Sequence, residues 1–158
     1  MAGGDLNGDG KTDLVTVNRG GGGDNNEGTI SIGLGDGAGH FTIQPNVSAM
    51  NASNPGGIAF ADFNSDGKMD LATPSDFGFS ILLGNGAGGF APRTQITTAN
   101  ASSIRTADLN GDGKADLAMV SEGGGGKVSI VFGDGMGGFS APSQYNVGAE
   151  PSDLGWRI

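Results

Sequence analysis

Residues 62–71 read DFNSDGKMDL, and this stretch decides the fold because it occurs three times. The other copies are DLNGDGKTDL at residues 5–14 and DLNGDGKADL at residues 108–117. A period of about 40–50 residues is typical of repeat architectures, in which each repeat forms one supersecondary unit. A second motif, a Gly-rich turn that ends in Phe, recurs between these stretches at residues 35–41, 84–90 and 133–139.

Each repeat is expected to form four short antiparallel strands, because short apolar runs bounded by Gly, Asn, Asp and Pro are strand signals. Four strands at this period predict an all-β chain of three β-propeller blades, with a β-helix or a β-sandwich as the less favoured alternatives. The repeats cover about residues 1–48, 49–98 and 99–147 of a single repeat domain, and residues 148–158 are interpreted as the orphan first strand of a further blade. The expected strands are 14–18, 29–34 and 41–47 in the first repeat, where the first strand is missing, 58–61, 71–74, 79–83 and 90–97 in the second, and 104–107, 117–121, 127–132 and 139–145 in the third.

The composition excludes several classes of protein. Of the 158 residues 33 are Gly, which leaves no window of helical length free of Gly and excludes a helical bundle. The chain has no Cys, and His40 is its single His, so thiolate zinc sites, cysteine nucleophiles and sites with two imidazoles are excluded. The net charge of −9 argues against binding to nucleic acid or to anionic membranes. No apolar run is long enough for membrane insertion.

The acidic residues are concentrated in the three repeated stretches, which share the pattern Asp-x-Asn-x-Asp-Gly-x-x-Asp-Leu. Calcium takes about six to eight oxygen ligands from flexible loops, whereas magnesium retains several waters in octahedral geometry and is less suited. Side chains at positions 1, 3, 5 and 9 and the backbone carbonyl at position 7 would converge on one Ca²⁺ per repeat, three per chain; the alternative is a set of Asn/Asp/Gly turns that bind nothing. The predicted ligands are Asp5, Asn7, Asp9, Lys11 and Asp13 in the first loop, Asp62, Asn64, Asp66, Lys68 and Asp70 in the second, and Asp108, Asn110, Asp112, Lys114 and Asp116 in the third.

With these loops and Gly-rich turns, the chain resembles the FG-GAP/VCBS-type repeat family, whose calcium-loop blades also occur in the integrin α-subunit head. The resemblance covers nearly the whole chain. It implies a β-propeller with one calcium in the loop between the first and second strands of each blade. It also implies an extracellular or cell-surface place and a role in adhesion, in carbohydrate binding or as an accessory module of a larger enzyme. The family's propellers generally have more blades than the three loops present here, and no signal peptide precedes Met1.

Two ends of the blades are expected to differ in role. The Asp-rich loops and the Gly-rich turns should share one end, and the connections that vary between repeats should share the other. Loops that vary on a repeated scaffold are where binding usually occurs, and residues 19–28 form the longest and most polar of them. His40 is interpreted as a solvated turn residue, and Phe41, Phe90 and Phe139 are expected to pack between blades.

The favoured function is a calcium-binding repeat module that acts in extracellular adhesion or binds a carbohydrate or protein ligand. The chain offers no set of nucleophile, base and acid. Two alternatives remain: a calcium-dependent hydrolase of phosphoesters, in which calcium acts as a Lewis acid, and a purely structural fragment of a larger surface protein. Loops of this type without the bidentate Glu of EF-hands bind calcium weakly, which suits an extracellular, cell-surface or periplasmic parent protein.

Self-association is expected, because three blades are too few to close a ring. The orphan strand could pair with the first blade of another copy through Leu154, Trp156 and Ile158. Such an exchange gives a homodimer with six blades, within the usual range. A larger homo-oligomer, or a place within a longer propeller, is the alternative.

Overall fold

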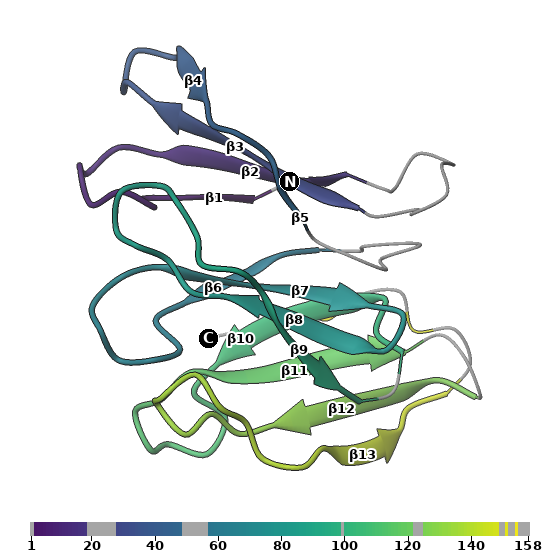
Figure 1. The fold of residues 1–158 in the computed structure, drawn as a ribbon. Helices are drawn as coiled ribbons and strands as arrows, with labels where there is room; N and C mark the ends of the chain where they lie inside the picture. Colours follow the sequence, from purple (N-terminus) through teal and green to yellow (C-terminus); the bar gives the residue numbers. More distant parts are fainter. Residues whose placement is uncertain are drawn as a thin grey trace.

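The computed structural model describes residues 2–18, 28–48, 57–98, 100–121, 125–148, 151 and 154. Within these ranges the secondary structure consists of short strands, which form three antiparallel sheets stacked one upon another (Figure 1). The all-β prediction and the prediction of three four-stranded blades are confirmed. Among the described residues, no helix is long and apolar enough to cross a membrane.

The strand order in each sheet follows the order of the sequence. Consecutive strands pair with each other, as in β-hairpins, except that the short last strand of the first sheet pairs with the third strand, and each sheet corresponds to one repeat. The strands are β1 (Ala2–Gly4), β2 (Asp13–Asn18), β3 (Thr29–Gly35), β4 (Phe41–Ile43) and β5 (Val47–Ser48) in the first sheet, β6 (Ala59–Ala61), β7 (Asp70–Ser75), β8 (Gly78–Leu82) and β9 (Thr94–Thr97) in the second, and β10 (Ser103–Ala107), β11 (Asp116–Ser121), β12 (Lys127–Val131) and β13 (Ser143–Asn146) in the third.

The first blade contains the first strand that the sequence analysis considered missing, so that prediction is wrong. β1 pairs antiparallel with β2, and Gly3 lies opposite Leu14. Gly3 and Gly4, which precede the first Asp-rich loop, are strand residues here. A Cβ at Gly3 would lie 3.2 Å from the carbonyl oxygen of Asp13, so the close approach of the two strands favours Gly.

This strand bears directly on the predicted strand exchange. The exchange requires an unpaired β2 edge in the first blade, and β1 occupies that edge. The reason given for the exchange is therefore lost. Trp156 and Ile158, which would supply the exchanged strand, lie outside the described residues.

The outermost strands are shorter than predicted. In the first blade the strand is divided into β4 and β5, which pair with different parts of β3 on either side of Pro45. In the other two blades Phe90 and Phe139 form isolated bridges, to Gly84 and Gly133, and regular pairing starts only at β9 and β13. Pro lacks a backbone donor and interrupts a ladder, which explains the division of the first strand.

The core lies between the sheets. One cluster of buried apolar residues joins the first and second blades and contains Leu6, Val15, Ile30, Ile32, Ile58, Leu71 and Leu82. The other joins the second and third blades and contains Ala59, Phe63, Ala72, Phe79, Ile81, Ala101, Ile104, Leu117, Met119 and Val131. Stacked repeats therefore bury each other's faces, as solenoids and propellers do.

The three Phe residues after the Gly-rich turns do not share one environment. Phe139 packs edge-on against Phe63 and Phe79, with ring centroids 5.7 and 5.3 Å away. Phe90 packs against the first cluster. Phe41 is 40% exposed, because it lies on the face of the first blade that points away from the second. The prediction of packing between blades is confirmed for two of the three.

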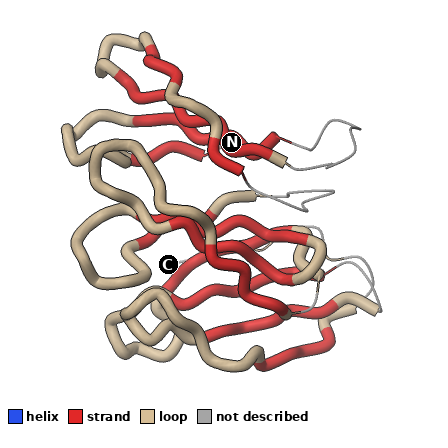
Figure 2. The backbone as a smooth tube through the Cα atoms, in the orientation of Figure 1, coloured by secondary structure: helices blue, strands red, loops and turns tan. Residues whose placement is uncertain are grey.

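The Asp-rich loops and the Gly-rich turns project from the same end of the sheets, on the left in Figures 1 and 2. This arrangement follows from antiparallel pairing, because the connection between the first and second strands and that between the third and fourth leave a sheet at the same end. The longest of the variable connections, residues 19–27, lies outside the described residues.

Candidate functional site

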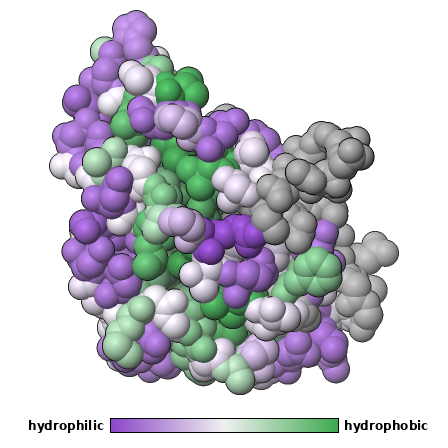
Figure 3. Space-filling model, in the orientation of Figure 1, coloured by the Kyte–Doolittle hydropathy of each residue, from purple (hydrophilic) through white to green (hydrophobic). Residues whose placement is uncertain are grey.

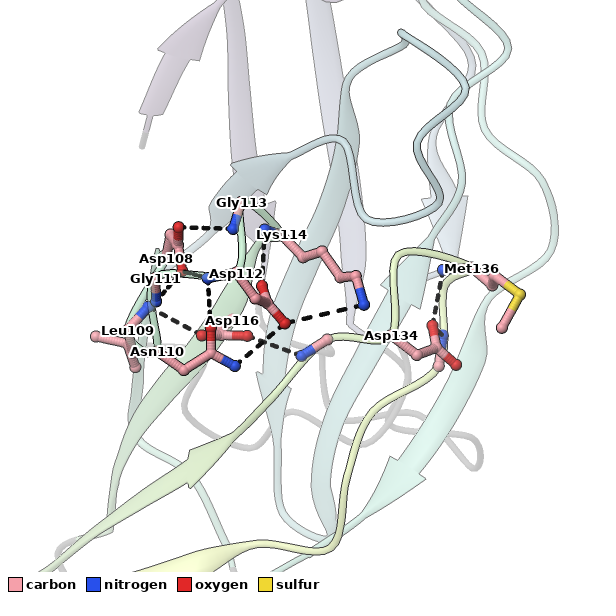
Figure 4. A network of polar contacts seen from close by, with 12 residues as sticks. Asp108, Leu109, Asn110, Gly111, Asp112, Gly113, Lys114, Asp116, Asp134 and Met136 are labelled. Carbon is pink, nitrogen blue, oxygen red and sulfur yellow. Dashed lines mark hydrogen bonds and ion pairs between the residues drawn. The ribbon is translucent and has the colours of Figure 1, made fainter.

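The first carboxylate of each Asp-rich loop organises the loop around itself. In the third loop, Asp108 accepts hydrogen bonds from the backbone N–H groups of Gly111, Asp112 and Gly113 at 2.7, 3.1 and 2.9 Å (Figure 4). The N–H of Gly113 is the main cause that lowers the pKa of Asp108. Gly113 has φ of 81°, in the left-handed region that favours Gly, so the sixth position of the pattern is needed for the turn.

Positions 3, 5 and 7 continue the same network. Asn110 accepts a hydrogen bond from the N–H of Asp112, and Asp112 accepts one from the N–H of Lys114, both at 2.9 Å. In the first and second loops the corresponding N–H groups are the main cause that lowers the pKa of Asp9 and Asp66. Asp9 and Asp66 therefore stay ionised at neutral pH on the exposed side of their loops.

The Lys at position 7 places its ammonium beside the carboxylate at position 5. The Nζ–Oδ2 distance is 3.4 Å for Lys11 and Asp9, and 3.3 Å for Lys68 and Asp66. In the third loop the pair is wider, at 3.9 Å. All these side chains remain partly exposed, so the ion pairs contribute little to stability. Their location matters more, because the ammonium occupies space at a carboxylate that a cation would use.

The Asp at position 9 has a different environment from the other four positions. Asp13, Asp70 and Asp116 are fully buried. Asp116 accepts hydrogen bonds from the backbone N–H of Leu109 through Oδ2 and of Gly133 through Oδ1, both at 2.9 Å. These bonds connect the Asp-rich loop to the Gly-rich turn of the same blade, and Figure 4 shows the carboxylate between the two.

The same double acceptor occurs in the other blades. Asp70 accepts from the N–H groups of Phe63 at 2.9 Å and of Gly84 at 2.8 Å. Burial is the main cause that raises the pKa of Asp70, against the lowering effect of these two donors. The carboxylate is thus costly to ionise and is held in place by charge-assisted hydrogen bonds.

The glycine at the start of each Gly-rich turn permits this connection. A Cβ at Gly35, Gly84 or Gly133 would overlap the carbonyl oxygen of the residue that precedes the buried Asp. Only Gly can therefore bring its N–H to the carboxylate at this distance from the loop. Sequence reasoning assigned these glycines to turn geometry and missed this close approach. The signal was available, since the same Gly follows the third strand in every repeat.

The loops suit a hard cation in the chemistry of their donors, because positions 1, 3 and 5 offer only carboxylate and amide oxygens and position 7 offers a carbonyl. Within the ranges that the structure describes, no three Asp, Glu or His side chains form a group that could hold a metal ion by themselves. The buried carboxylate at position 9 does not form a cluster with the carboxylates at positions 1 and 5, because both its oxygens accept hydrogen bonds from backbone N–H groups. The assignment of the fifteen calcium ligands stays a prediction.

His40 lies at an exposed position in the first Gly-rich turn. Its Nδ1 is 2.9 Å from Oδ2 of Asp36. The N–H groups of Ala38 and His40 are the main causes that lower the pKa of Asp36. The pair closes a turn on the surface, and this placement agrees with the interpretation of His40 as a solvated turn residue.

A groove runs between the outer strands of the first and second blades. One part has a volume of about 440 Å³ and is lined by the segment around Pro45 and by Phe90 and Pro92. A second part of about 430 Å³ shares Val47 and Pro92 with the first and continues toward Gln95. The break between β4 and β5 shapes this groove, because it turns residues 44–46 away from regular pairing. Figure 3 shows a strip of hydrophobic residues along this side of the molecule.

The edge of the groove carries polar groups, and Arg93 adds a positively charged side chain to the lining of its second part. Gln44, Asn46 and Ser48 line one side, and Asn46 accepts a hydrogen bond from Ser31 at 2.9 Å. On the other side, the Gln95 amide donates to Ser75 at 3.0 Å. The groove therefore combines an apolar floor with amide and hydroxyl groups at its edge, which is the usual composition of a small-molecule site.

The fold and the repeated loops define a repeat protein built of β-propeller-type blades. The chain belongs to the FG-GAP-like repeat family, which it matches over residues 5–73 and 74–119. The suspected resemblance is therefore confirmed. No curated protein sequence matches the chain.

Solved structures with the same fold include two of known context. One is an Agrocybe aegerita lectin described as recognising non-reducing terminal N-acetylglucosamine, with a TM-score of 0.59 and 24% identity over 90% of this chain. Another is the Photorhabdus luminescens Tc holotoxin pore, with a TM-score of 0.54 and 20% identity over 92% of this chain. This chain spans 37% of the lectin chain and 7% of the toxin chain. At these identities the likeness establishes the fold alone.

Proposed function

We propose that the chain is a ligand-binding module for a carbohydrate, stabilised by calcium in its Asp-rich loops and working outside the cell. The groove between the first two blades carries this proposal. Its floor, with Phe90 and Val47, suits the apolar C–H face of a sugar ring. Its rim, with Gln44, Asn46 and Ser48, suits sugar hydroxyl groups, which act as both donors and acceptors. The similarity to a lectin that recognises N-acetylglucosamine supports the same ligand class.

Calcium is part of the proposal because of the donor set of the loops. Asp, Asn and carbonyl oxygens at positions 1, 3, 5 and 7 are the ligands that a hard cation takes. The carboxylate at position 9 already accepts two backbone hydrogen bonds. It would bind the ion while keeping both of them. An extracellular place agrees with this proposal, since weak calcium loops fill only where calcium is abundant.

Titration calorimetry with N-acetylglucosamine, followed by a glycan array, tests the carbohydrate proposal. We expect Asn46→Ala to weaken binding about tenfold, the equivalent of one hydrogen bond. Asn146→Ala is the matched control, because Asn146 is an exposed amide on the last strand of the third blade, away from the groove. Binding to no glycan, or equal losses in both variants, would refute the assignment of the groove.

A further inference from the structure

Each blade has two faces, and the repeat shows which face meets which neighbour. We call the leading face the one with the Leu after the Asp-rich loop and the Phe after the Gly-rich turn. The opposite, trailing face carries the alternate apolar residues of the third strand, such as Ile30 and Ile32 in the first blade. Leu71 and Phe90 of the second blade pack in one cluster with Ile30 and Ile32 of the first. The leading face of one blade therefore packs on the trailing face of the blade before it.

The second interface repeats this arrangement. Leu117 and Phe139 of the third blade pack with Phe79 and Ile81 of the second. These four residues occupy the same repeat positions as the four at the first interface. The interface is thus a property of the repeat, and its two halves can be recognised on any blade.

The leading face of the first blade is exposed. It carries Leu14 and Phe41 at the positions of Leu71 and Phe90, together with Ile43. Phe41 is 40% and Ile43 69% exposed. A hollow of about 200 Å³, lined mostly by apolar surface, lies among these side chains and Gly33. This face is the half of an interblade interface that receives a neighbour.

A glycine in the turns shows what the neighbour would contribute. A Cβ at Gly88 would lie 2.8 Å from the Leu34 side chain, and a Cβ at Gly137 would lie 3.8 Å from that of Leu83. Both Leu residues belong to the trailing face of the preceding blade. The equivalent Gly39 of the first blade meets no described atom within 4 Å. A large apolar side chain at the position of Leu34 is what this turn lacks.

The trailing face of the third blade offers such a side chain. Phe132 occupies the position of Leu34 and Leu83, at the end of the third strand, and is 37% exposed. Val128 and Ile130 precede it at the positions of Ile30 and Ile32 and are only half-buried.

We infer that the leading face of the first blade binds the trailing face of the third blade of a second copy of this chain. Phe132 of one copy would lie against Gly39 and Phe41 of the other, as Leu34 lies against Gly88. The two exposed faces of the chain are the two complementary halves of one repeated interface. A second copy therefore supplies the matching face, and no unrelated partner is needed. Two copies related by a two-fold axis would form the contact twice and assemble six blades, within the usual range of about four to eight. This head-to-tail contact needs no exchange of strands.

The inference is tested by the mass of the full chain in solution, from sedimentation equilibrium over a range of concentrations. We expect the unmodified chain to form a dimer, and both Phe41→Asp and Phe132→Asp to convert it to monomer. Both side chains are exposed, so the variants should keep the melting temperature of the monomer. Phe77→Asp is the matched control, since Phe77 is 59% exposed and belongs to neither face. It should leave the dimer intact.

A mixture distinguishes this arrangement from a symmetric contact of two leading faces. Phe41→Asp retains an intact trailing face and Phe132→Lys an intact leading face, so the two monomeric variants should form a one-to-one dimer when mixed. A chain that stays monomeric at every soluble concentration overturns the inference. So does a dimer that survives Phe41→Asp, or one that Phe41→Asp breaks and Phe132→Asp leaves intact.

Discussion

Asp66 and Asp70 lie four residues apart in the same repeated motif, and these two Asp side chains have different environments and different roles. Asp66 is exposed, and the N–H of Lys68 is the main cause that lowers its pKa. Asp70 is buried between two backbone donors, and burial raises its pKa. The repeated motif therefore has an outer part, whose oxygens are available for a cation, and an inner part that joins two connections of the blade.

The largest effect is expected from removal of the inner carboxylate. Asp70→Ala would leave the N–H groups of Phe63 and Gly84 without their acceptor. Buried donors without a partner cost about 1–3 kcal/mol each, so the loss of the acceptor for both should lower the free energy of unfolding by about 2–6 kcal/mol. Urea unfolding in the presence of a chelator measures this loss without a contribution from calcium.

Asp66→Ala is the control in the same loop. Because Asp66 is exposed, its removal should have a much smaller effect on the metal-free chain. Equal losses in the two variants would show that the two ends of the loop do not differ as described.

Calcium should have the next largest effect, and it should act through the outer part. A ligand that binds only the folded state adds about 2.7 kcal/mol at a free concentration one hundred times its dissociation constant. We expect EGTA to lower the melting temperature and excess calcium to restore it. Asp66→Asn should weaken this calcium effect while leaving the metal-free melting temperature nearly unchanged, since Asn still accepts from the N–H of Lys68.

Asp134→Asn is the matched control for calcium. Asp134 lies in a Gly-rich turn, outside the loops, and the second repeat carries Asn85 at the same position. The calcium effect should therefore be unchanged in this variant. A melting curve that does not respond to EGTA after confirmed metal removal would refute the role of calcium altogether.

The outer and inner carboxylates should have opposite effects on stability as the pH falls. The pKa values of Asp9, Asp66 and Asp108 are lowered in the folded chain, so these groups stabilise it above their ordinary pKa of 3.8. That contribution is lost as the pH falls below about 4 through their folded values. Asp70 acts in the opposite direction, because its raised pKa favours the protonated form in the folded chain.

The pH dependence is measured by urea unfolding in chelator between neutral pH and pH 2. Stability should decrease on acidification, and Asp70→Asn should make the decrease steeper by removing the opposing group. A shallower decrease in this variant would contradict the raised pKa of Asp70.

The smallest effect concerns the Lys at position 7. Its ammonium lies 3.3 Å from the position-5 carboxylate in the second loop. Lys68→Met keeps the carbonyl but removes the competing charge, so calcium should bind more tightly, by at most about fivefold for an exposed pair. Calorimetry of calcium binding measures this change. Tighter binding in Lys127→Met, a variant outside the loops, would attribute the effect to net charge instead.

The strands and the interblade packing were largely predictable from the sequence. β7, β8, β11 and β12 begin and end within one residue of their predicted bounds, because each is an apolar run between Gly-rich or Asp-rich connections. The packing of Phe139 between blades followed from its place after a turn. The role of the Asp-rich loops as calcium ligands stays a prediction.

The features that were missed depend on contacts that a local pattern does not contain. β1 contains Gly3 and Gly4, which carry no strand signal but allow close approach to β2. The burial of Asp70 follows from its pairing partner and from the turn at Gly84, which is distant in sequence. The exposure of Phe41 depends on what lies beside the first blade, which the blade's own residues cannot indicate.

The bond from each buried Asp to the glycine of its own turn has a consequence for how such proteins arise. In each blade, the buried Asp accepts its hydrogen bond from a glycine of the same blade. Adjacent blades, in contrast, pack on each other mainly through apolar side chains at repeated positions. A duplicated segment of coding sequence therefore encodes both the Asp–Gly hydrogen bond within the blade and the apolar face on each side of it. Copies can be added or lost in evolution without redesign of the blades that remain.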